Sequence, residues 1–434
     1  MFPISKQTLE DTIRRLGIVK MTSATIRQIC ALAAALEEEA GERFVHLEIG
    51  NPGLPAVMTG VNAEIEALKG GIANKYPDIA GIPRLKKAGS EFVKAFLDID
   101  ISPRGIVPTV GSMQGCFTML LLLGQRVPGK DTMLYINPGF PAQRNQAKIL
   151  GLKEAAFDIY NYRGDRLEPK LRSILDNGNV TGIIYSNPNN PAWTNLTEQE
   201  LDTIGRLATE YDVFVLEDLA YFGMDFRHYM GEPYREPFVP TVAKYTDNYI
   251  LLLSASKIFS YAGQRIALVC MGDKVAARRF PYLEQFYEMP TFGDAYIYGV
   301  LYTASSGTAH SAQYAMAAML EEATAGRLDF VGLCGEYGRR GGRARKIFLD
   351  NGFHLVYDRD GDRPVSDGFF FTAGYKGMDS EQLHSALLRF GVSSIPLPST
   401  GSKQDGVRIC VSLLDNDEAF NILNERLKAF RNEH

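Results

Sequence analysis

Short apolar segments alternate with amphipathic helical segments through the middle of the chain, and this alternation restricts the fold more than any other feature. Residues 182–185 have the composition of a buried strand, and residues 213–216 that of the next one. Between them, Thr197 and Glu200 have the spacing of a capping box, which predicts that a helix begins there. Its inward face is expected to comprise Leu201, Ile204, Leu207 and Ala208. This strand–helix–strand pattern predicts an α/β fold with a central, mostly parallel sheet.

The same pattern predicts further elements on both sides of this unit. Strands are expected at residues 132–136, 249–253 and 266–271. The last hundred or so residues predict a smaller α+β unit, with strands at 369–372 and 407–412 and helices at 380–390, ended by Gly391, and at about 415–430. A helix is expected at 25–39, and a long helical stretch from about Ser311 is expected to connect the two regions. We therefore expect a large domain over residues 49–310 and a small domain assembled from residues 1–48 and 311–434.

Composition excludes several classes of protein. The 434 residues carry a net charge of −5, a poor match for a dedicated nucleic-acid binder. The longest apolar runs, such as residues 119–123, are far too short to cross a bilayer, and residues 1–17 have no apolar signal region. Six scattered histidines and five cysteines without a C-x-x-C pair predict no metal site and no disulfide framework. Reduced cysteines of this kind are typical of a cytoplasmic protein.

One motif is misleading. Residues 124–131 nearly match the phosphate-binding pattern G-x-x-x-x-G-K-[ST], but Asp131 stands where a hydroxyl is needed. The expected order of elements is also reversed, with a helix before the loop and a strand after it. We therefore interpret this segment as a turn, and an ATPase is not expected.

The most informative stretch is Leu253-Ser-Ala-Ser-Lys257, at the end of an apolar strand. A lysine at the carboxyl end of a buried strand lies where α/β sheets bind ligands. The hydroxyls of Ser254 and Ser256 could donate to a phosphate, and Arg265, eight residues after Lys257, could clamp it. Taken alone, an ordinary surface lysine would be the favoured interpretation.

Two more stretches follow predicted strands. Asp218 comes at the end of one, with Tyr221 three residues on, a pair that could hold a protonated pyridine nitrogen and contact a ring hydroxyl. A cap by Asp218 is about equally compatible with the sequence. The other stretch is Ser-Asn-Pro-Asn-Asn190-Pro, whose two Asn-Pro steps predict a rigid, extended loop, or simply a turn.

An anion site and a buried arginine complete the set. Gly111, Ser112 and Met113 precede an apolar helix, so their N–H groups suit a phosphate, although Gly-Ser before a helix is also a common N-cap. Arg408 lies in the middle of an apolar strand, where an unpaired guanidinium is costly, so we expect it to face a carboxylate of the protein or, with somewhat better odds, of a substrate. Together these stretches would suit a single ligand that carries an aldehyde, a pyridinium, a ring hydroxyl and a phosphate. Pyridoxal phosphate has all four groups.

The chain resembles the aspartate-aminotransferase-like (class I/II) family of fold-type-I pyridoxal-phosphate-dependent enzymes. The resemblance rests on the ordered motifs Asn-Pro-Asn-Asn-Pro, Asp-x-x-Tyr and Ser-x-Ser-Lys with the arginine eight residues on, and extends from Val45-His-Leu-Glu-Ile-Gly50-Asn-Pro to Arg408. It implies that Lys257 bonds covalently to the cofactor and, once freed by substrate, moves a proton between the substrate Cα and C4′. It further implies that Asp218 keeps the ring nitrogen protonated and that Asn190 and Tyr221 contact the ring oxygen.

The resemblance also assigns the surroundings. Phe140 matches an aromatic that stacks on the cofactor ring, and Arg408 matches the residue that binds the substrate α-carboxylate, with Gly50 and Asn190 beside it. Tyr76 matches a tyrosine that reaches the phosphate of a neighbouring subunit, which implies a homodimer with shared active sites. The expected phosphate-site residues are Gly111, Ser112, Met113, Ser254, Ser256 and Arg265.

Two departures from the family pattern stand out. The family usually continues Asn-Pro with Thr-Gly, whereas this chain has Ala192-Trp193, and the glycine usually found after Arg-Ile is Ala267. Trp193, the single tryptophan, is expected to lie beside the cofactor ring and to add bulk near the substrate route. The resulting pocket is expected to be apolar or aromatic, and the particular amino acid is not readable.

The motif set predicts an aminotransferase that exchanges an amino group between an L-amino acid and a 2-oxo acid by a ping-pong cycle. A C–S β-lyase, or other carbanion chemistry on the same scaffold, is the alternative within chemistry. A non-catalytic regulatory protein is the alternative from another class, and the charge of −5 argues against it.

Overall fold

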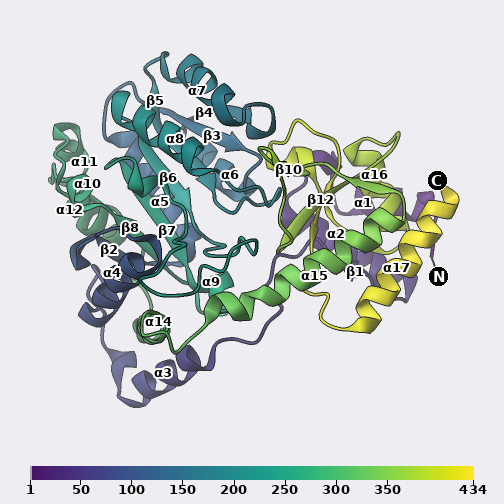
Figure 1. Cartoon of the computed structure of the whole chain (residues 1–434), viewed down its shortest axis with the longest axis horizontal. Helices are drawn as coiled ribbons and strands as arrows, with labels where there is room; N and C mark the ends of the chain where they lie inside the picture. The colour runs from purple at the N-terminus through teal and green to yellow at the C-terminus, as the bar shows by residue number, and fades with distance from the viewer. Residues whose placement is uncertain (1) are drawn as a thin grey trace.

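The computed structural model describes residues 2–434, and its largest element is a seven-stranded sheet (Figure 1). One strand, β8, runs antiparallel to both of its neighbours, and the other strands of this sheet in residues 2–434 are parallel to one another. In spatial order the strands are β2 (Ile106–Val110), β8 (Ile266–Met271), β7 (Tyr249–Ser254), β6 (Phe214–Asp218), β5 (Val180–Ser186), β3 (Thr132–Asn137) and β4 (Lys153–Asp158). The mostly parallel sheet predicted from the sequence is confirmed.

Helices cover both faces of this sheet, so alternate residues of each strand enter two separate cores. On β7, Leu251 and Leu253 pack in one core, and Ile250 and Leu252 in the other. Burial on both faces explains why the strands are apolar throughout rather than alternating in polarity. One core includes α4 (Pro83–Leu97), α7 (Leu167–Leu175), α8 (Glu198–Glu210) and α14 (His310–Thr324). The other includes α5 (Gly111–Gln125) and the π-helical segment Ala295–Leu301.

Local signals in the sequence placed several elements correctly. Helix α8 begins after Thr197, whose hydroxyl accepts from the N–H of Glu200 while the Glu200 side chain accepts from the N–H of Thr197. The predicted capping box is therefore present. The misleading motif before β3 is a turn, and its Lys130 donates to the carbonyls of Tyr211 and Asp212, each at 2.9 Å.

The C-terminal part forms a smaller α+β unit around a four-stranded antiparallel sheet of the order β14 (Ile395–Pro396), β15 (Val407–Cys410), β12 (Phe370–Tyr375) and β9 (Phe353–Leu355). A separate core joins this sheet to α15 (Phe330–Asp350), α16 (Ser380–Arg389) and α17 (Asp417–Glu433). Strand β1 (Val45–His46) pairs in parallel with β13 (Val392–Ser393), which attaches the N-terminal region to this unit. A small hairpin, β10 (Arg359–Asp360) with β11 (Arg363–Pro364), projects from it.

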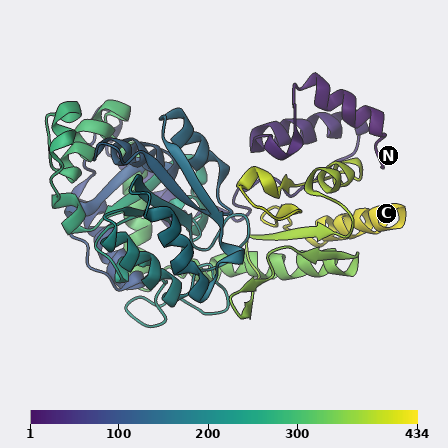
Figure 2. The ribbon, with the colours of Figure 1, turned by 90° about the horizontal axis from the view of Figure 1, so that it is seen from above.

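The N-terminal helices α1 (Lys6–Arg15) and α2 (Ile26–Ala40) pack on the same unit, against Leu388 and Ile395. Figure 2 shows them along one flank of the smaller unit, and Figures 1 and 2 show both chain ends at the end of the molecule far from the large sheet. The smaller unit therefore combines segments from both ends of the described chain.

The expectation of one long helical stretch from Ser311 is wrong. The structure has two helices there. Gly326 has a φ of +71°, which a right-handed helix cannot include, so the helix is broken between α14 and α15. Helix α14 packs against α3 (Met58–Lys69) and α4 beside the large sheet, whereas α15 crosses to the smaller unit (Figure 1). A domain division at residue 310 therefore remains a prediction.

Further short helices complete the described chain, and none of the helices in residues 2–434 is long and apolar enough to cross a membrane. The described residues also hold no cluster of metal-ligating side chains, and all five cysteines are free thiols. The short helices are α6 (Pro141–Ile149), α9 (Ala255–Ile258), α10 (Asp273–Ala277), α11 (Glu284–Tyr287), α12 (Phe292–Asp294) and α13 (Tyr302–Ser305).

Candidate active site

The carboxyl ends of the parallel strands bring the candidate residues to one edge of the large sheet. Strand β6 ends at Asp218 and β5 at its register partner Ser186, four residues before Asn190. Strand β7 ends at Ser254, and the short helix α9 that follows carries Lys257. Ligands of open α/β sheets bind at this edge, because loops and helix starts meet there. Asp218, Asn190 and Lys257 therefore lie at the edge of the sheet where the sequence predicts them.

Asp218 is a buried carboxylate, only 6% exposed, whose partners are neutral. Its Oδ2 accepts from Nε2 of Gln143 at 2.8 Å, and its Oδ1 accepts from the N–H of Ala220 at 3.1 Å. Within residues 2–434 no lysine, arginine or histidine forms an ion pair with it. Burial raises the pKa of Asp218 to about 6, although both hydrogen bonds oppose this shift. This carboxylate would therefore stabilise a cation bound beside it.

Lys257 is held with its amine directed back across the site. Its Nζ donates to the carbonyl of Gly50 and lies 5.5 Å from the ring centroid of Phe369. Burial lowers the pKa of Lys257 to about 8, and the nearby guanidinium groups of Arg408 and Arg265 act in the same direction. A larger fraction of this amine is therefore neutral, and able to attack a carbonyl, than for an exposed lysine.

Arg408 lies deep in the site, near Glu48 but with no carboxylate of residues 2–434 in direct contact with it. It is 2% exposed, its Nη1 donates to Oδ1 of Asn190 at 3.3 Å, and its Nη2 donates to the carbonyl of Glu48. No carboxylate of residues 2–434 lies within ion-pair distance of it, and its buried Nε has no hydrogen-bond partner there. The sequence predicts that Arg408 faces a carboxylate of either the protein or a substrate. In the described chain, no carboxylate of the protein forms an ion pair with it.

Two of the predicted phosphate-site residues, Gly111 and Arg265, meet at the start of α5. A Cβ built on Gly111, which has a φ of +68°, would lie 2.4 Å from Nη2 of Arg265, so these two residues are in direct contact. No side chain of the described residues caps the first turn of α5, which contains Ser112 and Met113. Free N–H groups of a first turn favour an anion. The buried Ser254 hydroxyl accepts from the N–H of Ser256 at 3.1 Å.

An aromatic cluster forms one wall of the site. The Tyr221 ring lies 5.3 Å from that of Trp193, 5.4 Å from that of Phe369 and 5.4 Å from that of Phe370. Trp193 is completely buried, has a φ of +59° and packs so tightly that a Cβ on Gly368 would lie 1.9 Å from the indole. The tryptophan thus lies beside Tyr221, and its expected position near the cofactor ring stays a prediction.

Two predicted residues are not joined to this group. Tyr76 is 91% exposed, in the loop before α4, and within residues 2–434 it has no hydrogen bond or ring contact with the site. Phe140 is the N-cap residue of α6 and is half-buried, one helical turn before Gln143. The structure of one chain therefore leaves the expected roles of both as predictions.

Sequence reasoning missed two polar residues of the site. Gln143 lies in the first turn of α6, just after the N-cap residue Phe140, and its side chain donates to Asp218. In the sequence, only its spacing of three residues from Phe140 could have indicated this role. Glu48 gives its carbonyl to Arg408, and the signal was a charged residue inside the apolar run that leads to Gly50. Neither residue belongs to a motif with its own chemistry.

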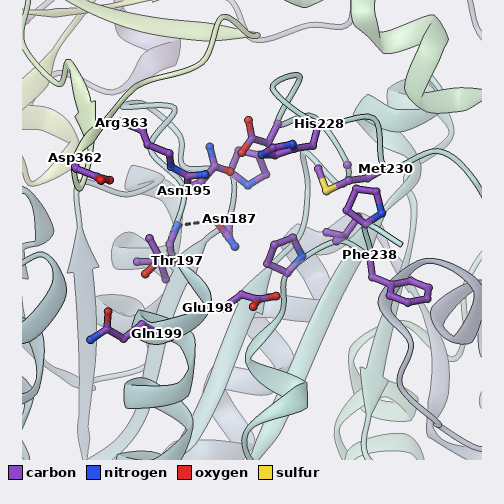
Figure 3. Close-up of a pocket in the computed structure, with 17 residues that line it drawn as sticks. Asn187, Asn195, Thr197, Glu198, Gln199, His228, Met230, Phe238, Asp362 and Arg363 are labelled. Carbon is purple, nitrogen blue, oxygen red and sulfur yellow. Dashed lines mark hydrogen bonds between the residues drawn. The ribbon is translucent and has the colours of Figure 1, made fainter. Parts of the chain in front are cut away.

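A separate hollow of about 520 Å³ opens beside the loop that follows β5 (Figure 3). In Figure 3, Asn187 and Asn195 line it from that loop, and Asp362 and Arg363 reach it from the β10–β11 hairpin. None of the predicted site residues lines the part of this hollow that residues 2–434 form. It is therefore distinct from the candidate active site.

Comparison with known proteins agrees with this geometry. The model of the family "Aminotransferase class I and II" matches residues 42–419. The aspartate aminotransferase of Pyrococcus horikoshii is 25% identical over 59% of this chain and 62% of its own length. The (5-formylfuran-3-yl)methyl phosphate transaminase of Methanocaldococcus jannaschii is 29% identical over 59% of this chain and 64% of its own length. Each match thus spans a little under two thirds of the curated relative.

Solved structures share the fold over almost the whole chain. The aspartate aminotransferase of Thermus thermophilus with maleate has a TM-score of 0.75 at 19% identity and covers 94% of this chain and 96% of its own. That of Thermotoga maritima has a TM-score of 0.75 at 20% identity and covers 99% and 100%. The fold is that of the fold-type-I pyridoxal-phosphate-dependent transferases. The chain belongs to the aminotransferase class I and II family, whose cofactor is pyridoxal phosphate.

The residues present fit this cofactor. Asp218 is a buried carboxylate with no cationic partner in the described chain, which suits a protonated ring nitrogen. The contact between Gly111 and Arg265 at the uncapped start of α5 suits a phosphate. Lys257 offers a partly neutral amine near Arg265 and Arg408.

Proposed function

We propose that this protein is a pyridoxal-phosphate-dependent aminotransferase that exchanges an amino group between an L-amino acid and a 2-oxo acid by a ping-pong mechanism. One observation carries the proposal: Asp218 and Arg408, both buried and without an ion-pair partner in residues 2–434, share a site with the amine of Lys257. A cationic ring and an anionic substrate carboxylate would compensate both charges. The relatives named above are aminotransferases or transaminases, so neither the lyase nor the regulatory alternative is favoured.

When bound, the cofactor supplies an electron sink that stabilises negative charge at the substrate Cα. Asp218 would hold the proton on the ring nitrogen, and Gln143 would keep the carboxylate oriented toward it. Tyr221 and Asn190 would contact the ring oxygen. Lys257 would bond to the cofactor, leave when the substrate amine arrives, and then move the proton between the substrate Cα and C4′.

Arg408 would bind the substrate α-carboxylate, using the Nε that lacks a partner in the described chain. Asn190 orients the guanidinium through its Oδ1 at 3.3 Å, and Gly50 lies beside it in the segment that follows Glu48. A planar fork of donors matches a carboxylate in geometry as well as in charge. Binding at both ends of the site would fix the Cα–H bond for proton removal by Lys257.

The phosphate would be held by two kinds of donor. Main-chain N–H groups of Gly111, Ser112 and Met113 lie at the start of α5, and Arg265 adds a guanidinium in contact with Gly111. The hydroxyls of Ser254 and Ser256 would add neutral donors from the end of β7. Phe140, on the loop before α6, would stack on the ring.

We further propose a homodimer in the cytoplasm. Tyr76 would reach the phosphate of a neighbouring subunit, and its almost complete exposure supports this, because an aromatic ring this exposed gains from burial in a partner. The five free cysteines support a reducing compartment. Within each subunit, we propose a large cofactor-binding domain and a small domain, with α15 crossing between them.

The test is a half-reaction screen of the purified protein loaded with pyridoxal phosphate. Each amino acid is added in turn and the absorbance of the lysine-bound cofactor is followed. Turnover that requires a 2-oxo acid acceptor is expected, and release of ammonia and pyruvate without an acceptor would instead indicate the lyase. Lys257→Ala should abolish both the lysine-bound absorbance and transamination, whereas Lys346→Ala, on the exposed face of α15, should not. Normal transamination by Lys257→Ala would overturn the role of Lys257.

A further inference from the structure

Two carbonyls of one short segment accept hydrogen bonds from the two cationic side chains of the site. The carbonyl of Glu48 accepts from Nη2 of Arg408, and the carbonyl of Gly50 accepts from Nζ of Lys257. Both side chains are long, so their charged ends are fixed only by the groups they contact. The position of residues 48–50 therefore determines in part where the guanidinium and the amine lie.

Strand pairing holds this part of the chain only as far as Leu47. The N–H of Leu47 donates to the carbonyl of Ser393 at 3.1 Å, and its carbonyl accepts from the N–H of Cys410 at 2.9 Å. The next main-chain N–H groups with a partner in residues 2–434 are those of Gly53 and Leu54, which donate to the Tyr337 hydroxyl. Between these attachments, the side chain of Glu48 is the anchor.

Glu48 is completely buried and is compensated by a histidine. Its Oε1 lies 2.8 Å from Nδ1 of His46, while its Oε2 has no hydrogen-bond partner in the described chain. The other ring nitrogen of His46, Nε2, lies 2.8 Å from Oε2 of Glu37 on helix α2. A neutral imidazole carries one N–H, so donating to two carboxylates requires the doubly protonated cation. These hydrogen bonds, led by that to Glu48, raise the pKa of His46 to about 9.

Other charged or titratable groups act on this chain of contacts from neighbouring elements. Arg426 of α17 is near Glu37, and Arg408 of β15 and Cys30 of α2 are near Glu48. Within residues 2–434 Arg408 is not within ion-pair distance of Glu48, so His46 is the cation in direct contact with the buried carboxylate. Removing that cation would leave the carboxylate buried without a contacting counter-charge, which is strongly unfavourable.

We propose that His46, held as a cation between Glu37 and Glu48, is a positioning residue that fixes residues 48–50 and through them the guanidinium of Arg408 and the amine of Lys257. This inference rests on the proposed function for its kinetic consequence. It also makes helix α2 part of the apparatus that positions the substrate carboxylate, because Glu37 lies on that helix.

The charge of His46 can be measured without turnover. Histidine labelled with carbon-13 in the loaded protein gives six ring signals, and the one missing in His46→Gln is that of His46. It is expected to titrate near pH 9, and at a lower pH in Glu37→Gln and Glu48→Gln, because each variant removes one of the carboxylates that raise the pKa of His46. Peptides covering residues 47–52 should exchange amide hydrogen faster in His46→Gln than in the parent. Titration of His46 near pH 6.5 in the parent protein, or unchanged exchange, would overturn the proposal.

The kinetic arm uses the amino acid that the half-reaction screen identifies. His46→Gln should raise KM for it by about tenfold while kcat changes by less than about threefold, because carboxylate binding is lost more than chemistry. Glu37→Gln, which leaves Glu48 paired, should give a smaller rise in KM and covers the case in which His46→Gln folds poorly.

The matched control is His354→Gln, at an exposed histidine on β9, which should leave KM unchanged. A lower melting temperature with unchanged KM in both variants would reduce His46 to a structural role. If no amino acid reacts, the proposed aminotransferase function is wrong. The titration and the hydrogen exchange still test whether His46 is a cation that fixes residues 48–50.

Discussion

The guanidinium of Arg408 lies over the ring of Phe370, with Cζ 4.7 Å from the ring centroid. Phe369, the preceding residue, stands 5.5 Å from Nζ of Lys257. Two adjacent aromatic side chains of one segment therefore contact the two cations of the site. Such contacts stabilise a cation that is partly stripped of water, in part offsetting the cost of its burial.

Replacing Arg408 by lysine should damage substrate binding selectively. Lysine keeps the charge but loses the planar fork, the contact over Phe370 and the hydrogen bond to Asn190. We expect KM for the amino acid to rise by roughly tenfold to a hundredfold, with the spectrum of the bound cofactor unchanged. Steady-state kinetics measure this, with Arg343→Lys on the exposed face of α15 as control. An unaltered KM would remove Arg408 from the carboxylate site.

Glu217 should make the stability of the cofactor-free protein depend on pH. It is completely buried, and burial raises its pKa to about 7, so the folded state retains its proton while the unfolded state loses it above about pH 4.5. The contribution of Glu217 to stability should therefore fall as pH rises from about 4.5 to 7, by at most about 3 kcal/mol. Glu217→Gln should remove this contribution and leave the separate one of Asp218, whose pKa burial also raises. Chemical denaturation at pH 5 and pH 8 checks it, and equal pH dependence of the two proteins would contradict it.

The fluorescence of Trp193 should report cofactor binding. It is the single tryptophan, is completely buried and lies 5.3 Å from the ring of Tyr221, which we expect to contact the cofactor. Emission should be quenched when pyridoxal phosphate is added to the cofactor-free protein, because cofactor and indole would lie close together. Trp193→Phe supplies the blank. Equal emission from the free and loaded protein would place the cofactor elsewhere.

Gly368→Ala should destabilise the protein. The new Cβ would lie 1.9 Å from the Trp193 indole, and the backbone of Gly368 is close to that of Gly341 on helix α15, which limits its movement. Overpacking of this kind costs about 1–3 kcal/mol or more. Gly335→Ala, at a helical position open to solvent, should instead be neutral or stabilising by about 0.5–1 kcal/mol. Thermal melts compare the two, and equal melting temperatures would show that the Trp193 contact yields easily.

Much of the fold and site could be predicted because the evidence was local. Apolar strands and the Thr197–Glu200 capping box marked the α/β pattern, and parallel strands bring Asp218, Asn190 and Lys257 to one edge whatever the intervening helices do. The break between α14 and α15 was missed because a glycine inside a helical pattern is tolerated in many helices.

The rest of the site depends on pairs of residues that are distant in the chain. Gln143 meets Asp218 across 75 residues, and Arg408 meets Glu48 across 360. A glutamine or a glutamate carries no indication of its partner, so three-dimensional contact is the only evidence for these roles. The Trp193–Gly368 contact is of the same kind. Gly368 does not have a positive φ, so nothing near it in the sequence shows why this position must be a glycine.

The close packing of Trp193 on Gly368 has an evolutionary consequence. An indole at position 193 leaves no space for a side chain at position 368, so position 368 cannot gain one while the tryptophan is retained. We expect relatives that keep the tryptophan to keep the glycine, and relatives with a small residue at position 193 to be free to carry a side chain opposite it. The pair should therefore be inherited together, as a marker of the subgroup of the family to which this chain belongs.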